Sequence, residues 1–231
     1  MINFSDFEKK TSIIFKDKEL LKQAFVHRSY INENPKAGLF HNERLEFLGD
    51  AVLELAVTDF LYRQYPSYTE GELTAVRSAL VNAIIISEVA AKMGMNDYLL
   101  LSRGEAKDNG KARQYILANT YEAYVGAVYL DQGYARAENL VRDTVLPNVS
   151  EIVAKKLWRD AKSLVQEKAQ ELVAVTPAYK VLQEAGPDHD KHFTVGIFFG
   201  PEKIAEGKGK SKQEAEQRAA EAALKAKNWL D

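Results

Sequence analysis

The segment over residues 42–53, NERLEFLGDAVL, places three acidic residues in a stretch that is otherwise good helix sequence. Residues three or four positions apart share one face of a helix, so Glu43, Glu46 and Asp50 are expected to lie together. Like charges at this spacing repel, at roughly 0.3 kcal/mol for each pair. A divalent cation would offset that cost, because hard cations such as Mg²⁺ prefer carboxylate oxygens. A solvated acidic face is the alternative, but the apolar residues between the acids favour a face near protein.

Apolar residues at helical spacing continue through most of residues 1–150. They predict helices near residues 17–27, 42–64, 69–92, 112–130 and 134–145, with loops at 31–38 and 102–111. Thr69 and Glu72 predict a capping box at the start of the third helix, since each can satisfy the other's backbone N–H. No convincing strand pattern occurs in this half, so residues 1–150 predict an all-α domain.

The pattern changes after residue 150. A short helix is expected at 160–172, followed by three strands near 177–184, 192–199 and 203–208, and by a final helix that Ser211 caps and that runs to about residue 227. This order predicts a three-stranded antiparallel sheet with two helices on one face. We therefore expect a multidomain chain: an all-α domain at 1–150, a short linker at 151–159, and a small α+β (α-β-β-β-α) domain at 160–231.

Composition excludes several classes of protein. The chain contains no cysteine, which rules out disulfides, thiolate zinc sites and a cysteine nucleophile. The N-terminal residues lack a signal-peptide pattern, and no apolar run approaches the roughly 18 residues of a membrane span. We therefore expect a cytoplasmic protein without a membrane partner. The net charge of −2 argues only weakly against a nucleic acid, because binding depends on where Lys and Arg cluster.

A second pair of polar residues lies in the helix predicted at 112–130. Asn119 and Glu122 are three positions apart, so both can point at the first acidic helix. The apolar residues around them indicate burial, and a buried glutamate without a partner is costly. On these residues alone, a metal-ligand role and a structural role for Glu122 remain equally open.

Several segments of the chain, taken together, resemble ribonuclease III. The segment 42–53 is similar to the signature helix of that family, and AFVHRSY at 24–30, YTEGELTAVRSALVN at 68–82 and ILANTYEAYVGAVYLDQGY at 116–134 agree with its flanking regions. DAKSLVQE at 160–167 and GKGKSKQEAEQRAA at 207–220 resemble a double-stranded RNA-binding domain. The resemblance covers nearly the whole chain in the domain order of the family.

The resemblance implies a metal site with four oxygen ligands on two helices, for Mg²⁺ with Mn²⁺ as a possible substitute. These ligands are Glu46, Asp50, Asn119 and Glu122. Glu43 and Glu70 would complete the catalytic acids by lining the cleavage valley. Phe47 matches an aromatic residue that inserts into a partner subunit, so the resemblance also implies a homodimer.

The implied reaction is hydrolysis of phosphodiester bonds in double-stranded RNA by a metal-activated water, which leaves 5′-phosphate and 3′-hydroxyl ends. The expected role is the maturation or decay of rRNA and mRNA. His27 and His41 are expected to be structural or to face RNA, since the metal already activates the water. A small-molecule phosphoesterase with a helical fold would leave the C-terminal α-β-β-β-α unit unexplained.

Asn119 departs from the family, which usually has Asp at this position. An amide oxygen can still ligate Mg²⁺, but it brings no negative charge and cannot act as an ionised base. Three interpretations follow: a natural variant that still cleaves, an engineered slow mutant, or a catalytically impaired double-stranded RNA-binding protein. We favour the first, because the other site residues match.

The resemblance also implies an RNA-binding surface in the C-terminal domain. Its members are Ser163, Gln166 and Glu167 on the first helix, His189 in a loop, and Lys210, Ser211 and Lys212 before the last helix. The helix residues and the loop would face minor grooves, and the lysines would bind phosphates at a helix N-terminus. A solvated charge run is the alternative for the lysines. Gln213 stands where the family commonly has Lys, which predicts weaker phosphate binding.

Overall fold

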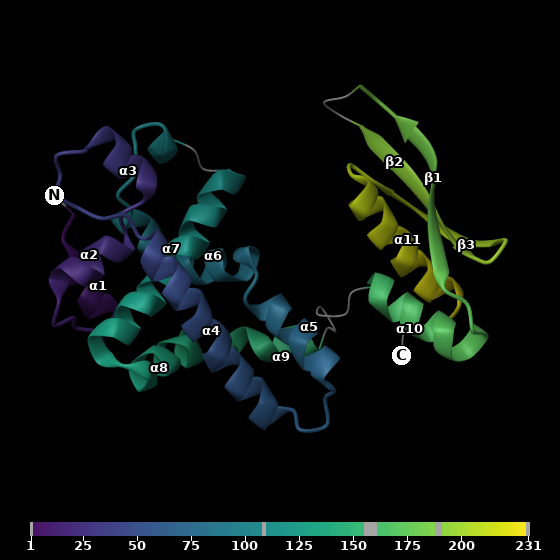
Figure 1. Ribbon diagram of the computed structural model, residues 1–231, viewed down its shortest axis with the longest axis horizontal. Helices are drawn as coiled ribbons and strands as arrows, with labels where there is room; N and C mark the ends of the chain where they lie inside the picture. Colours follow the sequence, from purple (N-terminus) through teal and green to yellow (C-terminus); the bar gives the residue numbers. More distant parts are fainter. Residues whose placement is uncertain (1, 108–109, 155–160, 188–190, 230–231) are drawn as a thin grey trace. The chain divides into compact units, whose positions relative to one another are not determined.

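The computed structural model describes residues 2–107, 110–154, 161–187 and 191–229. The chain divides into two compact units, Met1–Trp158 and Arg159–Asp231 (Figure 1). The expected linker at 151–159 overlaps a helix at Val149–Ala154, and Ile152 of that helix is buried in the core of the first unit. The remainder of the expected linker, 155–159, lies outside the described residues.

The first unit is helical, as predicted. Its elements are α1 Phe4–Thr11, α2 Lys18–Ala24, α3 Arg28–Glu33, α4 Glu43–Gln64, α5 Glu70–Leu80, α6 Ala83–Lys92, η1 Met95–Tyr98, η2 Glu105–Lys107, α7 Lys111–Gln132, α8 Tyr134–Thr144, η3 Leu146–Asn148 and α9 Val149–Ala154. Within the described part of this unit, the β-structure is limited to one isolated bridge between Val26 and Leu100.

The capping box at the start of α5 is confirmed, because the Thr69 hydroxyl accepts from the Glu72 N–H and the Glu72 carboxylate accepts from the Thr69 N–H at 2.8 Å. The single helix predicted at 69–92 is wrong. The Asn82 side chain accepts from the N–H groups of Ile84 and Ile85, both at 3.0 Å, and so begins a separate helix, α6. The loop predicted at 31–38 is partly wrong as well, since α3 continues to Glu33.

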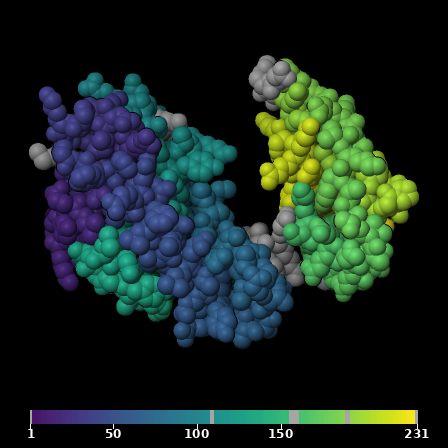
Figure 2. All heavy atoms as spheres, in the orientation of Figure 1, coloured from purple at the N-terminus to yellow at the C-terminus, as the bar shows by residue number. Residues whose placement is uncertain are grey.

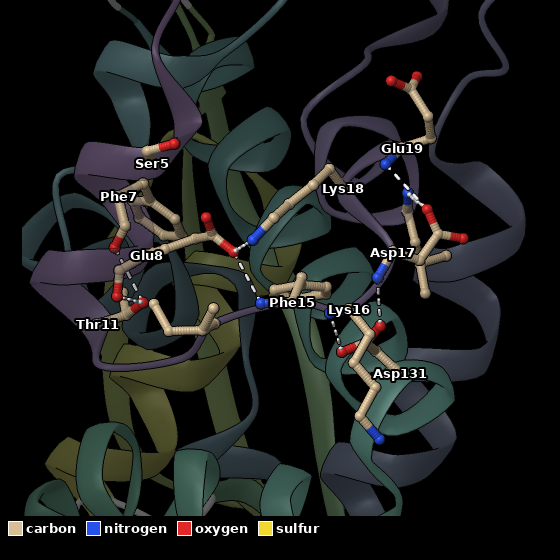
Figure 3. A network of polar contacts seen from close by, with 12 residues as sticks. Ser5, Phe7, Glu8, Thr11, Phe15, Lys16, Asp17, Lys18, Glu19 and Asp131 are labelled. Atoms are coloured by element: carbon tan, nitrogen blue, oxygen red, sulfur yellow. Dashed lines mark hydrogen bonds and ion pairs between the residues drawn. The ribbon is translucent and has the colours of Figure 1, made fainter.

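Helix α7 is the centre of the first unit and packs against α4, α6 and α8 (Figure 1). Tyr121 and Tyr124 of α7 are fully buried. Two acids fix the N-terminal segment, as Figure 3 shows: Glu8 joins α1 to α2, and Asp131 joins the segment to α7. Buried Glu8 accepts from Lys18 Nζ at 2.6 Å, while Asp131 at the end of α7 accepts from the N–H groups of Lys16 and Asp17.

The second unit has the predicted α-β-β-β-α order. Its elements are α10 Ala161–Val173, β1 Pro177–Ala185, β2 His192–Phe199, β3 Glu202–Gly209 and α11 Lys212–Ala226. The strands form an antiparallel sheet in the order β1-β2-β3. Inward residues of β2, such as Ile197 and Phe199, pack against α10 and α11. This confirms the predicted fold class.

Glycines let β3 approach α11 closely. A Cβ at Gly207 would overlap the backbone of α11 at Ala215 and Ala219, and a Cβ at Gly209 would lie 2.7 Å from the nitrogen of Ala215. Any larger residue would therefore push the strand off the helix. This contact fixes the position of the turn at residues 210–212 that joins the two elements.

No individual helix in the described ranges has the length and hydropathy of a membrane span. Helices α5 and α6 reach those criteria only when taken as a pair, and a bend of 45° separates them.

Candidate active site

Two glycines set the distance between α4 and α7 at the point where the two helices pack. A Cβ on Gly49 would overlap the carbonyl oxygen of Glu122 and lie 2.6 Å from its carbonyl carbon. A Cβ on Gly126 would overlap the carbonyl oxygen of Leu45 and lie 3.0 Å from the Gly49 nitrogen. Only glycine at both positions permits this approach, which brings Glu122 of α7 to the acidic face of α4.

The acids on the two helices act on one another. Burial raises the pKa of Glu122 to about 8, and the carboxylates of Asp50 and Glu46 add to the increase. Burial also raises the pKa of Glu46, with a further contribution from Glu43, while a side-chain hydrogen bond with Asn119 opposes the rise. The structure therefore brings together the four residues that were predicted to hold a metal.

The donor set fits a hard divalent cation. All four side chains offer oxygen atoms, and none of Glu46, Asp50 and Glu122 forms an ion pair with a basic group in the described part of the chain. Among the described residues, no three His, Cys, Asp or Glu side chains converge closely enough to enclose an ion. Mg²⁺ does not require such a cage, since it commonly keeps several waters and uses one or two carboxylates.

The other two predicted acids are placed differently: Glu43 acts on Glu46 from the first turn of α4, whereas Glu70 lies on α5. Glu43 begins α4 and faces Arg28 at 3.6 Å and His41 at 3.7 Å. Glu70 begins α5, where its carboxylate accepts from the Thr74 hydroxyl at 3.3 Å. Helix α4 continues for about 20 Å beyond Asp50 before the turn that leads to α5. Within one chain, Glu70 is therefore separated from the four-residue cluster.

Glu54 is an acid that the sequence analysis did not single out. It lies four residues after Asp50 on α4, is partly buried, and contributes to the raised pKa of Glu122. The i, i+4 spacing from Asp50 is the signal that could have identified it. The resemblance to ribonuclease III assigned no role to this position.

Phe47 follows Glu46 on α4 and points away from the core. Its side chain is 81% exposed, and that of Phe40 is 78% exposed. Large aromatic side chains are usually buried, so exposed ones often mark a surface that a partner covers. The role of Phe47 as a dimer contact stays a prediction.

In the second unit, the predicted residues of α10 share one exposed face. Ser163, Gln166 and Glu167, with Gln170 and Glu171, line a shallow groove of about 660 Å³. Their spacing of three and four residues is that of one helix face, opposite the buried Val165 and Ala169.

The predicted phosphate-binding turn lies at the N-terminus of α11. The Ser211 hydroxyl caps the helix by accepting from the Glu214 N–H at 3.1 Å. Lys212 is paired with Glu184 of β1 at 3.1 Å and also lies over the ring of Phe193. The predicted RNA contact His189 falls outside the described residues.

Comparison with known proteins agrees with both units. A Ribonuclease-III-like family model matches residues 17–149, and a double-stranded RNA binding motif matches residues 161–227. Ribonuclease 3 of Borreliella burgdorferi is 45% identical over 222 residues, which cover 96% of this chain and 90% of the relative. Ribonuclease 3 of Anoxybacillus flavithermus is 42% identical over 223 residues, which cover 96% and 93%.

A solved structure agrees with the first unit. The nuclease domain of ribonuclease III from Campylobacter jejuni, whose description refers to a region involved in dimer formation, is 36% identical with a TM-score of 0.57. The match covers 63% of this chain and 98% of that domain. Fold and site thus define a nuclease joined to a double-stranded RNA-binding module. The chain belongs to the ribonuclease III family of endoribonucleases.

Proposed function

We propose that this chain hydrolyses phosphodiester bonds of double-stranded RNA with a divalent metal, which leaves 5′-phosphate and 3′-hydroxyl ends in the maturation or decay of rRNA and mRNA. The observation that carries the proposal is the mutual repulsion of Glu46, Asp50 and Glu122 across the contact between α4 and α7. A protein gains nothing in stability from such a cluster, so a cation explains it best.

Each side chain has a role that its position supports. Glu46, Asp50 and Glu122 hold the metal through carboxylate oxygens, and the Asn119 side chain bonds to Glu46. If the Asn119 amide N–H₂ donates that bond, its carbonyl oxygen is free to be the fourth ligand. Mg²⁺, or Mn²⁺ in its place, would supply a bound water of lowered pKa and stabilise charge on the phosphate oxygens. Glu43 and Glu70 would line the path of the RNA.

The partner-binding surfaces are part of the same proposal. The exposed face of α10 and the turn of Lys210, Ser211 and Lys212 would bind the grooves and phosphates of duplex RNA. The exposed Phe47 would insert into a second copy of the chain, which would form a homodimer with two sites. Glu70 would then lie near the site of the partner rather than its own, since one chain keeps it away from the cluster.

The proposal is tested by incubating the full chain with a long RNA duplex, with Mg²⁺ and with EDTA. We expect cleavage only with Mg²⁺, into fragments that a 5′-phosphate-dependent exonuclease degrades. Single-stranded RNA of the same sequence is the substrate control. An intact duplex under both conditions would falsify the proposal.

A second candidate function is a double-stranded RNA-binding protein without catalysis, which the neutral Asn119 favours. Asn119→Asp distinguishes the two. If the parent chain cleaves and the variant cleaves with an equal or moderately higher rate, Asn119 serves as a ligand. If only the variant cleaves, while both bind duplex RNA equally in EDTA, the binding function is correct.

The homodimer is tested separately by light scattering of the full chain and of Phe47→Glu. We expect a dimer for the parent and a monomer for the variant, because the charge would be buried in the interface. Phe40→Glu is a matched control for the loss of an exposed aromatic residue. A parent chain that is monomeric at micromolar concentration excludes this part of the proposal.

A further inference from the structure

A cavity of about 310 Å³ in the first unit lies between the ends of α1 and α6 and one side of α8. Three cationic side chains from these three helices line it: Lys10, Lys92 and Arg136. Figure 2 shows the purple residues of α1 next to the teal-green residues of the α7–α8 region on the visible face of this unit. Among the described residues that line the cavity, Asp143 is the only acidic one, so the cavity carries a net positive charge.

The cations are not neutralised by the protein. Within the described residues, none of Lys10, Lys92 and Arg136 forms an ion pair. Both lysines occupy the last turn of a helix, where the helix dipole favours a positive charge. The dipole explains each lysine alone, but it does not explain why two helix ends and Arg136 meet at one cavity.

Arg136 is held in place rather than free. Its Nη2 donates to the carbonyl oxygen of Ser12 at 2.5 Å, which leaves the other N–H groups of the guanidinium available to an anion. The Lys10 ammonium lies directly over Gly94, since a Cβ at that glycine would overlap it. A planar guanidinium beside ammonium groups is the arrangement that proteins use for phosphate.

Two threonines in the lining use their hydroxyl groups within the protein, since Thr11 donates to the Phe7 carbonyl oxygen at 3.0 Å and Thr144 to that of Leu140 at 2.7 Å. Thr11 accepts from the buried Tyr124 hydroxyl at 3.3 Å, and Thr144 shares a hydrogen bond of 2.7 Å with the buried Tyr121 hydroxyl. These bonds orient both threonines from the core helix α7. The threonines therefore hold this wall of the cavity in place, and the polar contacts to a ligand come from the three cations and Asp143.

The remaining lining is apolar. Ile13, Met93 and Leu140 provide it, with Asp143 as an acceptor beside them. A bare phosphate ion would use the cations and leave these groups without contact. A ligand with an apolar ring and hydroxyl groups next to its phosphate would use all of them.

We propose that this cavity binds a nucleoside 5′-phosphate, either free or at the end of an RNA strand. The phosphate lies against Lys10, Lys92 and Arg136, the base lies against Met93 and Leu140, and Asp143 accepts from the ribose or base. This site uses no residue of the acidic cluster and does not depend on the proposed function.

Calorimetric titration of the full chain with AMP tests the proposal, with EDTA present so that the acidic cluster holds no metal. Adenosine and inorganic phosphate are the comparison ligands, and we expect both to bind at least tenfold more weakly than AMP. Replacing both lysines in Lys10→Ala/Lys92→Ala removes two charge-assisted contacts and is expected to weaken AMP binding about tenfold. Lys92→Glu is a second variant, which changes a single exposed residue. We expect it to weaken AMP binding by a similar factor.

The matched control is Lys16→Ala/Lys36→Ala, which removes two exposed lysines of the same unit away from the cavity and should leave AMP binding unchanged. Melting temperatures establish that each variant is folded. A 5′-phosphorylated oligoribonucleotide compared with its 5′-hydroxyl form shows whether the ligand is also accepted at a strand end. Equal affinity for AMP and inorganic phosphate, or AMP binding that survives both lysine variants, overturns the proposal.

Discussion

The two units of this chain position their functional groups by the same means and then expose them differently. In the first unit, Gly49 and Gly126 let two helices approach until the acids of α4 meet Glu122. In the second unit, Gly207 and Gly209 let a strand approach α11 and fix the turn that carries the lysines. In both cases, a residue without a side chain places the charges of its neighbours.

The difference lies in how the charges are compensated. The acids of the first unit are partly buried beside one another, so the pKa values of Glu46 and Glu122 rise. The charges of the second unit are exposed and are paired with opposite charges, such as Lys212 with Glu184. Under the proposed function, the first site would need a cation to offset this repulsion, whereas the second would exchange surface ion pairs for RNA phosphates.

The largest loss of stability is expected from a substitution at the contact between α4 and α7. Gly49→Ala places a methyl group in the backbone of Glu122, and we expect a loss of stability on the order of 3 kcal/mol or more. Thermal melting followed by circular dichroism measures it. Gly71→Ala on α5 is the control, because nothing lies within 4 Å of its Cβ and alanine favours a helix. Equal melting temperatures for the two variants would contradict the close contact.

Glu122→Gln tests the repulsion in the first unit. The pKa in the folded chain, about 8, exceeds the ordinary value of 4.5, so the carboxyl contributes stability below pH 4.5 that is lost as the pH rises to 8. Without metal, the variant should gain stability over the parent across this range, on the order of 2 kcal/mol at pH 8. This is about half of what the difference between the two pKa values would give, because the carboxyl is partly open to solvent. Chemical denaturation at pH 5 and pH 8 measures the gain.

The same variant should lose function. Removal of one ligand is expected to lower the rate of duplex cleavage by about a hundredfold or more. It should also remove most of the increase in melting temperature that Mg²⁺ gives the parent chain. A variant that Mg²⁺ stabilises as strongly as the parent would show that Glu122 is not a ligand.

Lys210→Ala tests the exposed charges of the second unit. The residue precedes the N-cap of α11, and loss of its charge should weaken duplex binding by roughly fivefold and reduce the salt dependence by about one charge. Gel shifts at several salt concentrations in EDTA measure both quantities. Lys225→Ala, in the last turn of α11, is the control and should leave both unchanged. An unaltered salt slope for Lys210→Ala would place this lysine away from the RNA.

The smallest expected change is an increase, rather than a decrease, in affinity for duplex RNA. Glu184 holds Lys212 at 3.1 Å, and both side chains are exposed. Glu184→Gln should release Lys212 and strengthen duplex binding by about twofold to threefold, since an exposed pair is worth less than roughly 1 kcal/mol. The same gel shifts measure it, and Glu206→Gln in the exposed pair with Lys203 is the control. Weaker duplex binding would show that Glu184 positions Lys212 for RNA instead of competing with RNA for it.

Local patterns predicted most of the elements correctly, because their signals act within a few residues. The Thr69 capping box and the Ser211 cap each satisfy backbone groups three positions away. The predicted helix at 69–92 was wrong for a comparable reason. Apolar residues continue across its middle, and only the side chain of Asn82, which can cap a helix as well as lie within one, decided the break.

Helix periodicity alone predicted that Glu43, Glu46 and Asp50 would share one face, and the change of pattern after residue 150 predicted two units of different class. The resemblance also named Asn119 and Glu122 as their partners, and the structure shows how they meet: α4 packs on α7 at Gly49 and Gly126, which brings Glu122 to Glu46 and Asp50. The tertiary structure also added Glu54 to the cluster and kept Glu70 away from it. A helical pattern predicts the face on which a side chain lies. The distance between two helices depends on the size of the residues at their contact, and here both of these are glycines.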